Sequence, residues 1–141
     1  MRDALYATLA HNLGLSSREL AEIGGFSERF ARDLLAGRRP FPADVKQALL
    51  DIQDDIDVLT DSIEADVDEG QGAIWMFGTT EDLRLHFPAM PGRGKAPGGF
   101  IGPFRISALT AWDALKERGI DVDIVFHDLC RICSWYLMKH N

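Results

Sequence analysis

Two short helical segments separated by a pair of glycines constrain this sequence more than any other feature. Ser16 can cap the first segment, and Glu19 follows at the spacing of a capping box. The glycine pair ends that segment, because glycine adopts tight or left-handed turns at little cost. Ser27 can then cap a second helix over residues 28–36, which the next glycine ends. The pattern predicts a helix–tight turn–helix unit.

The second helix of such a unit enters the DNA major groove, and its first residues reach the base edges. An arginine can donate two hydrogen bonds to one guanine. Arg29 and Arg32 are three residues apart and share a helix face. We therefore expect base contacts from the open side of this helix: Ser27, Glu28, Arg29, Arg32 and Asp33.

Phosphate contacts are expected on either side of this helix. Backbone N–H groups at a helix N-terminus favour anions, and the first helix begins at such a point. Two arginines follow the second helix on a connector that two prolines stiffen. The expected phosphate-binding residues are Ser16, Ser17, Arg18, Arg38 and Arg39. The alternative is a pair of packed helices whose charges are merely solvated.

The net charge of −7 argues against DNA binding until its distribution is considered. Residues 1–42 carry six Arg and five acidic residues, and residues 43–70 carry one Lys and ten acidic residues. Residues 71–141 carry eight Lys or Arg and seven acidic residues. The acidic excess thus lies in one segment, which we expect to face away from DNA.

That acidic segment predicts one long helix over residues 43–70, with an aliphatic seam close to a heptad pattern. The seam can bury against a second copy of the chain or against its own strands and helices, and the sequence leaves both open. A twofold dimer would place two recognition helices about 34 Å apart, which predicts a palindromic site. The seam consists of Val45, Leu49, Ile52, Ile56, Leu59, Ile63 and Val67.

The remaining residues predict a small α+β half, so the expected fold is mainly α. Its domains are a helix-turn-helix head (1–42), a long acidic connecting helix (43–70) and an α+β dimerisation region (71–141). Within that region the patterns favour short strands over 73–77 and 122–126. They also favour helices from Thr79 or Thr80 to 87, over 104–118 and from 128 onward, and a Gly/Pro-rich loop over 88–103 that carries Arg93 and Lys95.

The connector resembles that of a known family. The recognition helix ends in Gly-Arg, a Pro-x-Pro connector follows, and Asp-Val begins the long helix. The chain is similar, over roughly residues 10–128, to small autoregulators associated with anti-CRISPR operons in phages and to related bacterial helix-turn-helix proteins. Arg32 stands where that family usually has Gln, and Asp33 where it has an aromatic residue. The matching residues are Arg29, Gly37, Arg38, Pro42, Asp44, Val45, Ile101, Gly102 and Arg105.

The resemblance implies a homodimer whose carboxy-terminal half makes the interface and whose recognition helices read an inverted repeat. It makes Arg29 the recognition arginine. It also implies repression of the protein's own phage or mobile-element operon, and RNA binding by some members. The alternative function is an antitoxin that neutralises a protein toxin through its second half.

Other classes of function find little support. No nucleophile-elbow, phosphate-loop or metalloprotease motif is present, so we expect no enzyme, no catalytic residue and no cofactor. His127, Cys130, Cys133 and His140 have the residue types of a zinc site or a redox pair. Cysteines three apart on a helix are more often small core residues, so we expect no metal. Without a signal-like or membrane-spanning apolar run, we expect a cytoplasmic protein.

Overall fold

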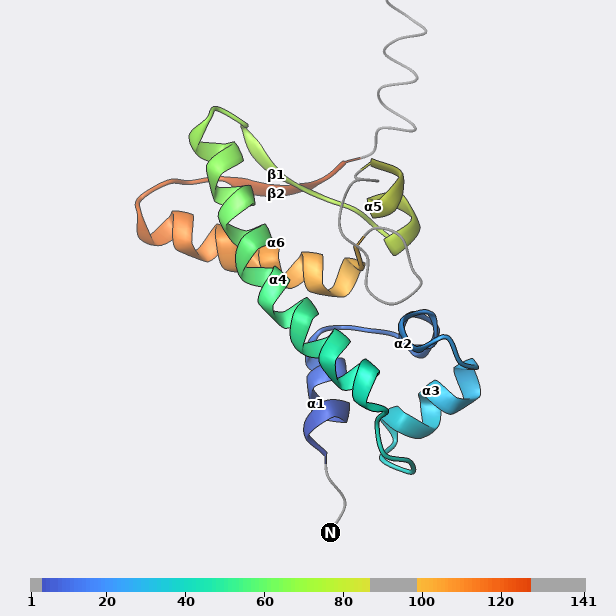
Figure 1. Ribbon diagram of the computed structural model, residues 1–141. Helices are drawn as coiled ribbons and strands as arrows, with labels where there is room; N and C mark the ends of the chain where they lie inside the picture. The colour runs from blue at the N-terminus through green and yellow to red at the C-terminus, as the bar shows by residue number, and fades with distance from the viewer. Residues whose placement is uncertain (1–3, 87–98, 128–141) are drawn as a thin grey trace, which may run out of the picture.

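The computed structural model describes residues 4–86 and 99–127, and it is mostly helical (Figure 1). Within those ranges the chain forms six helices and one sheet of two parallel strands. The mainly α expectation is confirmed in this coarse form. The helices are α1 (Leu5–Asn12), α2 (Ser17–Gly24), α3 (Glu28–Leu35), α4 (Ala43–Asp68), α5 (Thr80–His86) and α6 (Ile101–Glu117), and the strands are β1 (Ala73–Met76) and β2 (Asp123–Phe126).

Helix α4 joins two clusters of buried side chains (Figure 1). The N-terminal cluster lies among α1, α2, α3 and the first half of α4, with Leu20, Leu34 and Leu49 fully buried. The C-terminal cluster lies among the end of α4, the sheet, α5 and α6, and includes Ile74 and Leu115. At 26 residues, α4 is about 39 Å long, which is long enough to serve both clusters.

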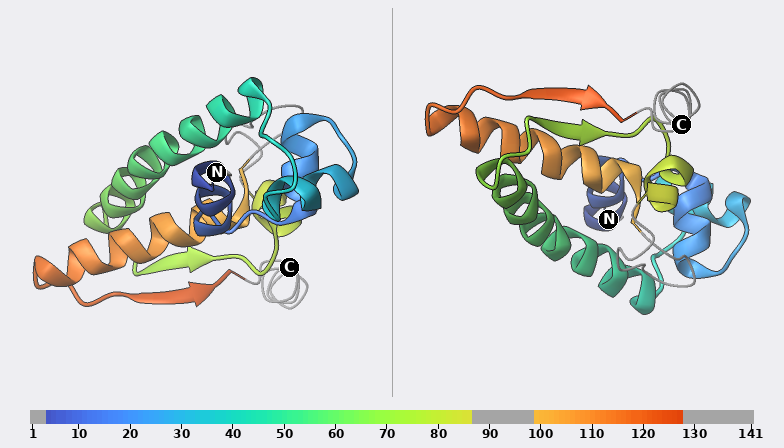
Figure 2. Two further views of the ribbon diagram at one scale, coloured as in Figure 1. Left: turned by 90° about the horizontal axis from the view of Figure 1, so that it is seen from below. Right: turned by 90° about the horizontal axis from the view of Figure 1, so that it is seen from above.

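The aliphatic seam of α4 packs against its own chain. Val45, Leu49, Ile52 and Ile63 are buried, and the other three seam residues are half-buried. Helix α6 covers much of this seam, and it lies between α4 on one side and the two strands on the other (Figure 2). The seam thus packs largely within its own chain, which is one of the two alternatives that the sequence left open. The helix ends at Asp68, two residues before the expected position.

The sheet pairs β1 with β2 in parallel, with Trp75 opposite Val125 and Met76 opposite Phe126. Strands that pair in this way need a long crossover, which α5 and α6 provide here. Ile74 and Met76 face the C-terminal cluster, whereas Trp75 and its partner Val125 lie on the other side and are 38% and 36% exposed. One side of the sheet is thus apolar and partly open.

Helix α6 begins at Ile101, three residues earlier than the sequence suggested, so the expected loop over 88–103 extends too far. A proline in the first turn of a helix costs little, because the N–H that it lacks would have no helical partner there. Pro103 occupies such a position. Gly102 lets this first turn approach the end of α1, because a Cβ there would lie 2.4 Å from the Leu13 carbonyl oxygen.

Two side-chain contacts join α2 to α5. Thr80 donates a hydrogen bond of 2.6 Å to the Glu19 carboxylate, and Arg84 forms an ion pair of 3.1 Å with Glu22. Arg84 is only 19% exposed, and it also donates to the Gly99 carbonyl oxygen. A half-buried, multiply bonded arginine contributes more than an exposed ion pair, because water screens it less. These contacts fix α2 against the second half of the chain.

We predict that Gly102→Ala lowers the stability of the protein by about 1–3 kcal/mol, because the added methyl group meets backbone atoms that cannot move aside. The melting temperature from circular dichroism measures this loss. Gly72→Ala is the matched control, since a Cβ there meets nothing within 4 Å, and its effect should stay within about 0.5 kcal/mol. Equal melting temperatures for the two variants would contradict the close approach of α1 and α6.

Candidate nucleic-acid interface

Helices α2 and α3 are both capped as their sequences suggest. The Ser16 hydroxyl accepts a hydrogen bond from the Glu19 backbone N–H, and the Glu19 carboxylate accepts one from the Ser16 N–H. Gly25 ends α2 with φ of 69°, and the Ser27 hydroxyl accepts from the Phe30 N–H at the start of α3. Both serine side chains therefore hold the helix ends. This local role leaves them less free to contact a ligand than the sequence suggested.

Helix α3 has one buried and one open side. Ala31 and Leu34 are fully buried in the N-terminal cluster, whereas Glu28, Arg29 and Arg32 are exposed. Arg32 lies 3.8 Å from Glu28, a long and exposed ion pair that a competing anion can displace. Among the described residues, Arg29 has no ion-pair partner. The open side of α3 thus presents two available guanidinium groups.

Asp33 is placed differently from the other α3 residues predicted to read bases. It forms ion pairs of 3.0 Å with Arg38 and 3.8 Å with Arg39, and its side chain is only 25% exposed. Its carbonyl oxygen also accepts the Arg38 N–H, while the Gly37 N–H donates to Leu34, with φ of 74° at Gly37. These two bonds form a Schellman motif. Asp33 therefore holds the two connector arginines close to the end of α3.

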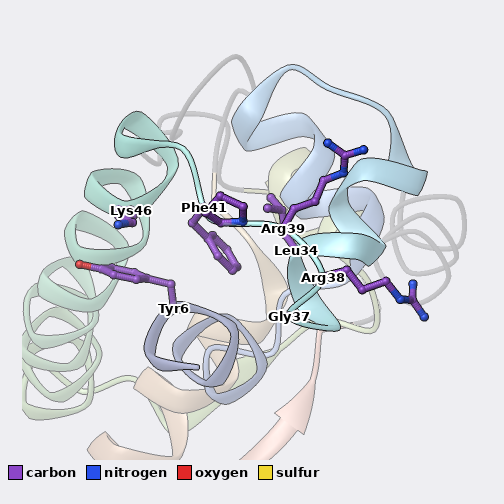
Figure 3. A pocket seen from close by; sticks show the side chains of 8 residues that line it. Tyr6, Leu34, Gly37, Arg38, Arg39, Phe41 and Lys46 are labelled. Carbon is purple, nitrogen blue, oxygen red and sulfur yellow. The ribbon is translucent and has the colours of Figure 1, made fainter. Parts of the chain in front are cut away.

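A hollow of about 280 Å³ lies beneath the connector (Figure 3). Tyr6 and Phe41 form part of its wall, and their ring centres are 6.1 Å apart. The Lys46 ammonium lies 5.1 Å from the Tyr6 ring centre. In Figure 3 the guanidinium groups of Arg38 and Arg39 point outward from the connector. The connector thus carries its positively charged groups on its outer side, and the aromatic rings of Tyr6 and Phe41 lie beneath it.

All ten residues that the sequence predicted to contact bases or phosphates lie in the described part of the chain. Seven of them lie on α3, its cap or its connector, and the other three lie at the first turn of α2. Sequence reasoning missed Lys46, which adds a cation beside the connector. The signal was available, because Lys46 is the single basic residue of the acidic segment and lies in the first turn of the helix that follows the connector.

Some sequence hypotheses fall outside the described ranges. Arg93 and Lys95 of the loop, the expected last helix, and Cys130, Cys133 and His140 all lie there. Within residues 4–86 and 99–127, no three His, Cys, Asp or Glu side chains gather in a way that could hold a metal ion. None of the helices in those ranges combines the length and the apolar character that crossing a membrane requires.

Comparison with known proteins adds no further constraint. No protein-family model matches the sequence, and no relative is found among the curated proteins. The resemblance to anti-CRISPR-associated regulators therefore stays a hypothesis, and the residues around α3 carry the argument for function.

We predict that Ser27→Ala destabilises the protein by about 1 kcal/mol, because the first turn of α3 loses its cap. Thermal or urea unfolding followed by circular dichroism measures the change. Ser27→Asp is the control: aspartate caps as well as serine, so this variant should unfold like the wild type. If Ser27→Ala were as stable as the wild type, the hydroxyl would not be acting as the cap.

Proposed function

We propose that the protein is a dimeric, sequence-specific DNA-binding repressor that uses α2 and α3 as a helix-turn-helix and reads an inverted repeat. Following the family resemblance, we propose that it represses its own operon. The observation that carries this proposal is the open face of α3, which presents Arg29 and Arg32 beside the connector arginines. Two guanidinium groups lie on α3 and two on the connector that follows it. This arrangement suits binding in a groove that is flanked by phosphates.

We propose two roles for these arginines, according to where they lie. Arg29 and Arg32 project from the helix that would enter the groove, so we assign them to bases. Arg38 and Arg39 lie beyond the end of that helix and are held by Asp33, so we assign them to phosphates. In this proposal Asp33 orients the phosphate-binding arginines and does not itself read a base, which revises the role expected from sequence.

The acidic charge of α4 is compatible with this assignment. Helix α4 starts at the connector and runs away from α3, so the acidic residues of its second half lie far from the open face of α3 (Figure 1). Arg118 pairs with Asp68 at 2.9 Å and with Glu64 at 3.7 Å, which offsets part of that charge. Repulsion of DNA phosphates by the rest is weakened by distance and by salt.

We predict that Arg29→Ala or Arg32→Ala weakens binding about tenfold to a hundredfold and removes protection at particular bases. The measurement is a footprint on the DNA upstream of the protein's own gene. Arg38→Ala or Arg39→Ala should instead weaken binding to every sequence alike and reduce the slope of affinity against salt by about one.

Arg118→Ala is the matched control for these four variants. It removes an exposed arginine that follows α6 and pairs with the last residue of α4, Asp68, so the footprint should not change. If the four variants all protect the DNA as the wild type does, the proposed face is wrong.

The dimer interface in this proposal is the free edge of the sheet at β2, because α6 already covers much of the seam of α4. Trp75 and Val125 face the side of the sheet that α6 leaves open, and they are 38% and 36% exposed. In the described part of the chain, only β1 pairs with β2, so one edge of β2 has no strand beside it. Exposed apolar strand edges favour pairing with another chain. Two β2 strands related by a twofold axis run antiparallel and would complete a four-stranded sheet.

We predict that Val125→Lys shifts the protein from dimer to monomer, since it places a charge on the open side of β2, within the proposed contact. Size-exclusion chromatography with light scattering at micromolar concentration measures the change. Val58→Lys is the control, because Val58 is 65% exposed on α4, away from the sheet. A monomeric wild-type protein, or a Val125→Lys dimer as stable as the wild type, would contradict this interface.

A further inference from the structure

Two histidines that are far apart in the sequence meet at one end of the sheet. His86 is the last residue of α5, and His127 directly follows β2. Their ring centres are 5.1 Å apart, and the ring planes are inclined by 77°. The His127 backbone N–H donates to the Met76 carbonyl oxygen, which holds this residue beside the end of β1. Nothing in the proposed DNA contact uses either ring.

The hydrogen bond of the His86 ring leaves the lone pair of its other nitrogen available. His86 Nδ1 lies 2.8 Å from the Asp82 carbonyl oxygen, and because a carbonyl only accepts, this nitrogen carries the proton. The lone pair of His86 is therefore on Nε2. A second ring nitrogen fixed by a backbone carbonyl is the usual setting of a metal-binding histidine.

His127 supplies the second observation. Its Nδ1 is buried and has no hydrogen-bond partner in the described part of the chain. A buried polar atom without a partner is rare, and a bound water or ion is one of the common explanations. The rings of Trp75 and Phe77 pack around His127, at 4.8 and 5.6 Å between ring centres, so carbon surrounds much of the imidazole.

The spacing of the rings fits a shared ion. An imidazole nitrogen binds zinc at about 2.0–2.1 Å, which puts the ring centre roughly 3.2 Å from the metal. Two such rings at a tetrahedral angle have centres about 5 Å apart, and the observed separation is 5.1 Å. Aromatic packing alone also permits this separation, but it does not account for the unpartnered Nδ1 of His127.

We propose that His86 and His127 form a two-histidine site for a divalent transition-metal ion, with zinc as the best match and water as the remaining ligands. Imidazole suits zinc, copper and nickel, and the described part of the chain offers no third protein ligand. The ion would tie the end of α5 to the end of β2. The sequence suggested a metal site only at His127 and the residues after it. That His86 lies beside His127 is visible only in the fold.

Titration of the metal-free full-length protein with zinc chloride, followed by calorimetry, tests the site. We expect one ion per chain and a higher melting temperature when zinc is present, because a ligand that binds only the folded state stabilises it. His86→Ala should weaken zinc binding by about tenfold or more, and His127→Ala should do the same. His11→Ala is the matched control, since His11 is exposed on α1, and it should bind zinc as the wild type does.

A Cys130→Ser/Cys133→Ser double variant distinguishes the two-histidine site from a site built by the cysteines. Cobalt in place of zinc reports sulfur ligands through a charge-transfer band. The deciding variant is His86→Ala, which changes a half-exposed side chain and should leave the fold intact by circular dichroism. If His86→Ala binds zinc like the wild type, or if the wild type binds no zinc, the proposal is wrong. Loss of binding in His86→Ala with retention in His11→Ala supports it.

Discussion

The packing of α6 against the aliphatic seam of α4 is the contact on which the rest of the structure depends. Helix α4 reaches both clusters of buried side chains, and α6 covers much of it while also supporting the sheet. Ser107 lies in this contact: its hydroxyl donates to the Pro103 carbonyl oxygen at 3.1 Å within α6 and lies 3.4 Å from the Ile56 carbonyl oxygen of α4. The first turn of α6 then meets the end of α1 at Gly102, so the same helix positions α3 relative to the sheet.

Several polar residues near α3 are already used in local contacts within the protein. Ser16 and Ser27 satisfy the first N–H groups of their helices, and Asp33 holds the connector arginines. Such local bonds compete with contacts to DNA, because a hydroxyl or carboxylate used for capping must keep its geometry. Arg29 has no ion-pair partner among the described residues, and Arg32 has only a long, exposed one with Glu28, so these two guanidinium groups are the ones proposed to contact bases.

The sequence predicted the elements well wherever the signal was local. Serine caps, terminal glycines and the heptad spacing placed α2, α3 and α4 within two residues, because each signal lies inside the element that it bounds. It misplaced the start of α6, where a Gly-Pro pair suggested a loop but the end of α1 required a close approach. It could not pair His86 with His127, or Arg84 with Glu22, since a single sequence carries no record of which distant residues meet.

The covered seam also changes how a dimer would present α3 to DNA. A dimer built on the seam would have set the two recognition helices by the crossing of two α4 helices. Because the seam is covered, the open edge of the sheet at β2 remains as the contact surface. Strand β2 lies at the opposite end of α4 from α3 (Figure 1). Two copies joined at β2 would then hold their α3 helices apart by means of two nearly rigid α4 helices. The spacing of the half-sites would follow from the angle at which the two sheets meet, so β2, rather than any DNA-contacting residue, would set that spacing.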